Sequence, residues 1–107
     1  MKHWDGLPKR LKVIGKRYKV RVVETVDAEG SDGESDQTSQ TILLRDDATH
    51  SFEYAREVAL HEAIHAVEHQ MHLDLSEAHV EGLGVGLLAL LRENRAFVRW
   101  LMALEKE

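Results

Sequence analysis

The sequence contains no cysteine among its 107 residues. Disulfide bonds and thiolate metal sites are therefore excluded, so any bound metal ion would have to be held by nitrogen and oxygen atoms. The single proline, Pro8, and Gly6 lie in the N-terminal segment 1–9, where we expect no regular structure. The length suits one compact domain and is too short for two ordinary ones.

Long hydrophobic runs are also missing. The longest apolar run, residues 85–91, spans about two helical turns, which is too short to cross a bilayer. The first five residues have no apolar segment after their charge, so they do not form a secretory signal. We therefore expect a cytoplasmic protein that does not bind a membrane.

The formal net charge of −5 hides an uneven distribution. Up to Arg21 the only acidic residue is Asp5, against the basic residues Lys2, Lys9, Arg10, Lys12, Lys16, Arg17, Lys19 and Arg21. The stretch 27–40 that follows is acidic. A basic segment can indicate nucleic-acid binding, but charged edge strands also discourage aggregation. We interpret the basic residues as solvated strand edges and expect no nucleic-acid partner.

Apolar patterning predicts three short strands, at residues 11–14, 19–26 and 41–45. The stretch 27–40 between the last two is polar, acidic and contains glycine, so we expect a flexible loop there.

Three helices are predicted to follow, at residues 52–72, 77–92 and 96–106. Thr49 or Ser51 can cap the first helix, and the second can be capped by Ser76 or by Asp74 in a capping box. The sequence thus predicts one α+β domain over residues 1–107. In it, a small, mostly antiparallel sheet of about three strands packs on two site-bearing helices, and a C-terminal helix completes the core.

The first predicted helix contains the motif His61-Glu62-Ala63-Ile64-His65. Residues four apart lie on one face of a helix, so both imidazoles can reach one ion. This His-Glu-x-x-His spacing is typical of zinc sites in metallopeptidases. Glu62 would lie beside the metal, where it can act as general base towards a zinc-activated water.

A catalytic zinc site needs a third protein ligand, which leaves the fourth position for water. The second helix offers Glu77, His79 and Glu81, of which the two glutamates are one turn apart on one face. One glutamate could bind zinc while the other orients a ligand histidine. We prefer Glu81, because Gly82 and Gly86 beyond it would allow a close approach between the two helices.

Three segments carry a family resemblance: the strand 41–45, the motif segment 59–67 and the run 75–87, which is followed by Arg92-Glu93-Asn94. Over residues 40–104 the chain resembles the small phage- and prophage-encoded metallopeptidases of the zincin type, relatives of bacterial peptidases that cleave phage or mobile-element repressors. The resemblance implies a third-ligand glutamate followed by a small residue, which maps onto Glu81-Gly82. It also implies that strand 41–45 lines the substrate cleft.

We therefore expect a zinc-dependent metallopeptidase that hydrolyses peptide bonds of a peptide or protein substrate. The metal ligands would be His61, His65 and Glu81, and the general base Glu62. The main alternative is a zinc-binding interaction module of phage origin that cleaves nothing, and a weaker one is a nucleic-acid-associated phage protein. The sequence leaves the substrate and the oligomeric state open.

Overall fold

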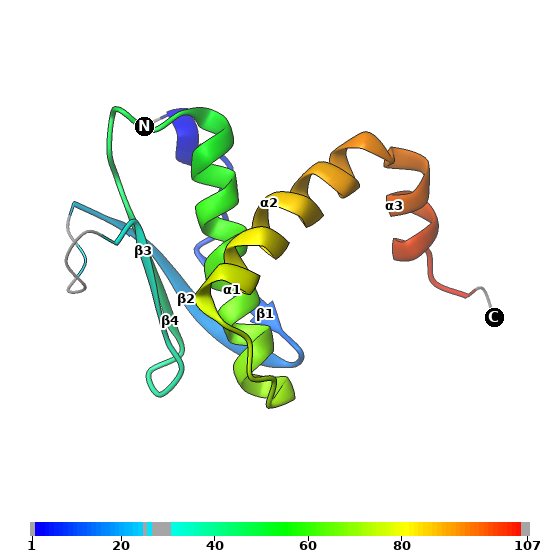
Figure 1. The fold of residues 1–107 in the computed structure, drawn as a ribbon, viewed down its shortest axis with the longest axis horizontal. Helices are drawn as coiled ribbons and strands as arrows, with labels where there is room; N and C mark the ends of the chain where they lie inside the picture. The colour runs from blue at the N-terminus through cyan, green and yellow to red at the C-terminus, as the bar shows by residue number, and fades with distance from the viewer. Residues whose placement is uncertain (1, 25, 27–30, 106–107) are drawn as a thin grey trace.

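The computed structural model describes residues 2–24, 26 and 31–105 and shows an α+β fold (Figure 1). A four-stranded mixed sheet packs on α1, and α2 packs on α1 in turn. The elements are η1 (Lys2–Trp4, a 3₁₀ helix), β1 (Arg10–Val13), β2 (Lys16–Val23), β3 (Gly33–Asp36), β4 (Thr41–Arg45), α1 (Phe52–Met71), α2 (Glu77–Glu93) and α3 (Arg95–Met102). No helix of this described part is long and apolar enough to span a membrane.

The sheet has the strand order β1-β2-β4-β3. Its two outer pairs, β1 with β2 and β3 with β4, are antiparallel, whereas the central pair β2 and β4 is parallel. The expected α+β class is confirmed, but the sheet is mixed and has four strands. The parallel pair arises because the chain leaves β2, forms the edge strand β3 first, and returns with β4 between them.

The first two strands are joined by a two-residue turn, Ile14-Gly15, in which both residues have positive φ, 48° and 84°. Such turns suit the twist of a β-hairpin. The turn explains why the strand expected at 11–14 ends at Val13 and why the next strand begins at Lys16 rather than Lys19.

Strand β3 lies within the stretch that we expected to be a flexible loop, so that prediction is wrong for residues 33–36. Residues 27–30 of the stretch lie outside the described part of the chain. Asp36 stabilises the turn into β4 by accepting hydrogen bonds from the backbone N–H groups of Thr38 and Ser39, at 2.9 and 3.1 Å. Pairing with β4 makes this polar segment a strand.

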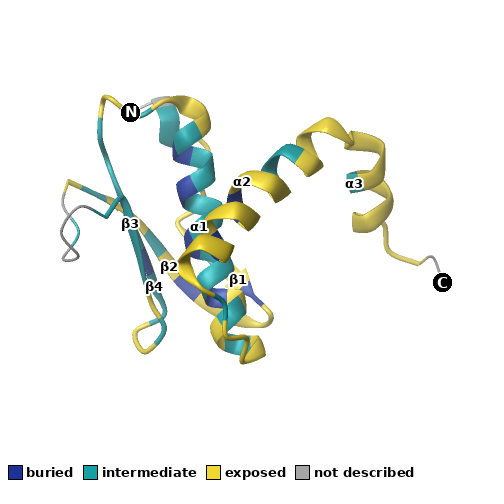
Figure 2. Ribbon diagram, viewed as in Figure 1, coloured by how far each residue is buried: buried dark blue, intermediate teal, exposed yellow. Residues whose placement is uncertain are grey.

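The core lies between the sheet and α1. Strand β4 buries alternate residues, Ile42 and Leu44, because it is central in the sheet. They pack with Tyr18 of β2 and with Val58 and Ala66 of α1. Helix α1 is thus apolar on the face towards the sheet, and Figure 2 shows its buried residues there.

Both long helices begin at a serine cap. Ser51 accepts a hydrogen bond from Tyr54 N–H, and Ser76 accepts one from His79 N–H. These caps confirm one of the two candidates at each start and fix α1 and α2 within two residues of the predicted ranges. Helix α3 ends earlier than predicted, at Met102, and has no buried residue, so the expectation that it completes the core is wrong.

Helix α2 contacts α1 through Val80 and Gly84, not through the two glycines that we expected. A Cβ atom at Gly84 would lie 3.6 Å from the backbone oxygen of Glu57, whereas one at Gly82 or Gly86 would meet nothing within 4 Å. The reason is helical spacing: positions 77, 80 and 84 follow an i, i+3, i+7 pattern and share one face. Because this face of α2 is turned towards α1, Glu77 also points towards α1.

The Gly84 contact can be tested by replacing two glycines of α2, one at a time, with leucine. Gly84→Leu should lower the free energy of unfolding by about 1–3 kcal/mol, because the added atoms push α2 away from α1. Gly86→Leu, the control, should leave it unchanged or raise it by up to about 1 kcal/mol, since leucine favours a helix over glycine. Urea denaturation measures both. Equal stabilities would show that the helices do not pack closely at Gly84.

Candidate metal centre

His61 and His65 lie on the same side of α1, because four residues correspond to about one helical turn. This side faces α2, whose Glu77 contacts both histidines. Their Nε2 atoms lie 3.2 Å apart. Both rings are only partly exposed, with 16% and 23% of the side-chain surface accessible. The motif therefore places two imidazole nitrogens side by side, as predicted.

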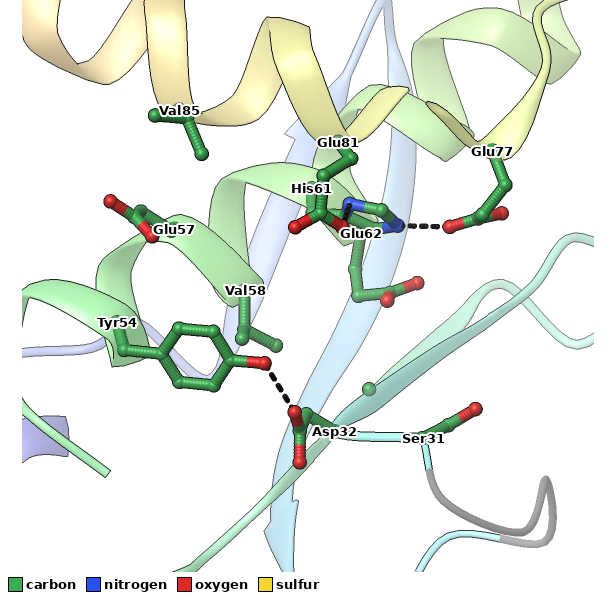
Figure 3. Close-up of a pocket in the computed structure, with 11 residues that line it drawn as sticks. Ser31, Asp32, Tyr54, Glu57, Val58, His61, Glu62, Glu77, Glu81 and Val85 are labelled. Carbon is green, nitrogen blue, oxygen red and sulfur yellow. Dashed lines mark hydrogen bonds and ion pairs between the residues drawn. The ribbon is translucent and has the colours of Figure 1, made fainter. Parts of the chain in front are cut away.

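Glu77, at the start of α2, joins the two histidines. Its Oε1 atom lies 2.5 Å from His61 Nε2 (Figure 3). The same atom lies 3.3 Å from His65 Nε2. One ligand atom from each of the three residues lies within 4.8 Å of the others, the one such metal-binding group found in the described part of the chain. The group offers two nitrogens and one oxygen, the donor set expected without cysteine.

The geometry of this triad fits a small metal ion. Ligand atoms held tetrahedrally at about 2.0–2.2 Å from one ion lie about 3.4 Å from each other. The His61–His65 and His65–Glu77 distances, 3.2 and 3.3 Å, already match that separation. The exposed Glu77 carboxylate, now 2.5 Å from His61 Nε2, would have to move away from that atom by a little under 1 Å. The three ligand atoms would then occupy three corners of a tetrahedron.

Glu81, the third ligand preferred from the sequence, is placed differently. Its carboxylate lies 4.0 Å from Nδ1 of His61, on the side of the ring away from the Nε2 atom that faces Glu77. His79, the other candidate, is exposed and is not in the cluster. The geometry thus favours Glu77 as the third ligand and places Glu81 where it can orient His61 from outside.

Glu68 orients the second histidine. His65 Nδ1–H donates to Glu68 Oε1 at 3.1 Å, and the other oxygen of Glu68 accepts a hydrogen bond from Leu75 N–H. Burial by itself lowers the pKa of His65, but hydrogen bonds to Glu68 and Glu77 outweigh it and hold the pKa above its ordinary value. A proton fixed on Nδ1 leaves Nε2 available to a metal ion.

Glu62 is the one buried charged side chain of the described residues, with 6% of its surface exposed. It points towards β3, where Ser35 Oγ lies 2.8 Å from Glu62 Oε1 and 2.8 Å from its backbone oxygen. Burial raises the pKa of Glu62 above the ordinary glutamate value, although the Ser35 hydroxyl and the two histidines act in the opposite direction. The carboxylate is thus held beside the triad.

Gly33 of β3 also lies against Glu62. A Cβ atom at this position would lie 2.9 Å from both Cγ and Oε2 of Glu62, closer than such atoms pack. Only glycine therefore lets the strand pass over the carboxylate without moving it. Gly33 and Ser35 together fix the position of Glu62.

Two hollows meet at the triad. One, of about 280 Å³, extends along α1 and α2 past Tyr54 and Val85, and the other, of about 710 Å³, extends towards Leu73. Gly33, Glu62 and Glu77 line both. The arrangement is an open groove with β3 on one side, the two helices on the other, and the triad midway along it.

Strand β4, which the resemblance placed along the cleft, lies inside the sheet instead. The strand beside the groove is β3, the edge strand. The sequence analysis missed Gly33 and Ser35 because they fall in a segment without apolar residues. Glu68 could have been found, since it follows His65 by three residues on the same face of α1.

Comparison with protein-family models, curated proteins and solved structures finds no match for this chain. The resemblance to zincin-type peptidases therefore stays a prediction, and the function has to be argued from the site.

The contact between Gly33 and Glu62 can be tested by a double-mutant cycle. Gly33→Ala should lower the free energy of unfolding by about 1–3 kcal/mol, because the methyl group displaces a buried carboxylate. The same substitution in a Glu62→Ala background should cost less than half as much, since the obstructing atoms are gone. Denaturant unfolding of the four proteins measures the difference. Equal costs in the two backgrounds would contradict the contact.

Proposed function

We propose that this protein is a zinc-dependent peptidase. The observation that carries the proposal is the triad of His61, His65 and Glu77 midway along an open groove, with the buried carboxylate of Glu62 beside it. A triad alone could hold a structural ion, but structural zinc sites have four protein ligands. Three protein ligands, a groove and an adjacent carboxylate together suit hydrolysis.

Zinc is the ion that the donor set suits best, because imidazole nitrogen favours zinc over calcium or magnesium, which take oxygen ligands. When bound, zinc supplies a Lewis acid that polarises a carbonyl group and lowers the pKa of water. His61, His65 and Glu77 would hold the ion. Glu68, through His65, and Glu81, near His61, would keep the rings in the orientation that binding requires.

Glu62 would act as general base and then as general acid. Burial raises the pKa of Glu62 above that of an ordinary glutamate and so brings it closer to neutral pH. A general base accepts and returns a proton most effectively when its pKa lies near the pH at which it works. Ser35 holds one carboxylate oxygen, Oε1, at 2.8 Å. Glu62 would take a proton from the attacking water and deliver it to the amine of the cleaved peptide bond.

The substrate would be an extended peptide. Strand β3 pairs with β4 along one side only, so its other edge borders the groove. An extended peptide can add to such an edge through main-chain hydrogen bonds. The two hollows would receive side chains on either side of the scissile bond.

The ligand assignment predicts an order of zinc affinities, measured by calorimetric titration of the metal-free protein. His61→Ala and His65→Ala should abolish tight binding. Glu77→Ala should weaken binding more than Glu81→Ala, for which a loss of about 10–100-fold is expected if it only orients His61. His79→Ala, a control on the same helix that is exposed and outside the triad, should bind zinc like the unmodified protein. A larger loss for Glu81→Ala than for Glu77→Ala would restore Glu81 as the ligand.

The role of Glu62 predicts a separation of binding from hydrolysis. Glu62→Gln keeps the size of the side chain but removes the base, so zinc should stay bound while cleavage of a peptide library falls on the order of 10²-fold or more. Asp74→Asn, at an exposed carboxylate between α1 and α2 that lines neither hollow, is the control and should stay active.

Two outcomes would contradict this reading. Undiminished cleavage by Glu62→Gln would remove Glu62 from its role. A zinc-loaded unmodified protein that cleaves no member of the library would favour the non-catalytic interaction module instead.

A further inference from the structure

The second half of α2 and all of α3 form an apolar arm that projects from the body of the protein (Figures 1 and 2). Large apolar side chains along it are 37% to 90% exposed: Leu83, Leu87, Leu90, Leu91, Phe97, Trp100, Leu101, Met102 and Leu104. Helix α3 has no buried residue, and among the described elements it packs appreciably only against α2. The arm therefore has no covering within the described chain.

The exposed side chains are ordered along each helix. On α2, Leu83, Leu87 and Leu90 follow an i, i+4, i+7 pattern, about a quarter turn from the face that packs on α1. On α3, Phe97 and Trp100 stack their rings at 6.2 Å between centroids. Leu101 continues that stripe, and Leu104 follows just beyond the end of α3. Helices with such stripes are built to pack against another surface.

The area involved is too large for a free surface. From the exposed fractions, these side chains leave on the order of 1,000 Å² open to water, whereas the largest apolar patch on a monomer is about 300–600 Å². A standard protein–protein interface buries about 800 Å² on each partner. The arm alone supplies that area.

We propose that the arm is the dimer interface of the protein and that its occupant is the arm of a second copy. The residue types are those of an interface centre: leucine, phenylalanine, tryptophan, methionine and arginine, with no lysine or aspartate between Leu83 and Leu104. A two-fold pair of arms would cover both patches at once, and two-fold dimers are the commonest oligomers.

Charge also favours a second copy. Helix α3 carries Arg95 and Arg99 and no acidic residue, whereas Glu93 at the end of α2 is exposed and its neighbour Arg92 is already paired with Glu53 of α1. When α3 of one copy packs on α2 of the other, opposite charges face each other on both sides of the two-fold axis. A lipid surface is the less suitable occupant, because the chain as a whole is acidic, with a net charge of −5, and anionic lipids would repel it.

Sedimentation velocity of the full chain tests the interface. At micromolar concentration the unmodified protein should sediment as a species whose mass is twice the 12.2 kDa of one chain. Trp100→Glu and, separately, Leu90→Glu should raise the dimer dissociation constant by about 100-fold or more, because each buries a charge in the contact. Trp100 is 72% exposed and Leu90 45% exposed in one copy, and neither is in the core, so circular dichroism of the variants should stay that of the unmodified fold.

Ile14→Glu is the matched control. Ile14 is also a large exposed apolar residue, but it lies in the turn between β1 and β2, and neither strand packs appreciably on α2 or α3, so this variant should dimerise like the unmodified protein. Three results would overturn the proposal: a single-chain mass at every concentration, unchanged dimerisation of both arm variants, or loss of dimerisation in the control alone. Monomers that co-sediment with phosphatidylglycerol vesicles through Trp100 would instead assign the arm to a membrane.

Discussion

Helix α1 is packed on two sides, and this constraint decides where each of its polar side chains lies. The sheet covers the face that carries Val58 and Ala66, and α2 covers the face that carries His61. Successive residues turn by about 100° around a helix, so His61 and its neighbour Glu62 cannot share a face. The histidines consequently face α2, while Glu62 is directed under the edge of the sheet.

Burying Glu62 requires compensation, because a carboxylate removed from water loses hydration. Strand β3 supplies part of it through the Ser35 hydroxyl, and the nearby imidazoles supply favourable charge. The same strand leaves room for the carboxylate only because residue 33 is glycine. The edge strand, the helix and the carboxylate therefore depend on each other, and the groove between β3 and the helices exists because of this arrangement.

Local sequence predicted the elements that local forces determine. The helix starts at Ser51 and Ser76 follow from capping, and β4 follows from its run of β-branched and aliphatic residues. The two histidines follow from their spacing alone. Each of these signals lies within a few residues of the feature it predicts.

The features that the sequence did not predict depend on contacts between distant segments. Strand β3, with the sequence Gly-Glu-Ser-Asp, has no apolar residue, and only its pairing with β4 makes it a strand. Glu77 and Glu81 share one face of α2, so the choice between them depends on where along its length α2 lies against α1, which the contact at Gly84 helps to set. Neither the partner strand nor that placement is encoded in the spacing of residues along one helix.

Helix α2 links the triad to the apolar arm. Glu77 lies in its first turn and is itself largely exposed, and the helix is anchored on α1 through Val80, Gly84 and, in its last turn, an ion pair between Arg92 and Glu53. The last turns of α2 continue into the arm, so a partner bound to the arm would also hold α2 in this position on α1. The fraction of molecules in which Glu77 lies within reach of the histidines sets the apparent affinity of the proposed site. Dimerisation through the arm would thus strengthen ion binding at Glu77 without adding a ligand.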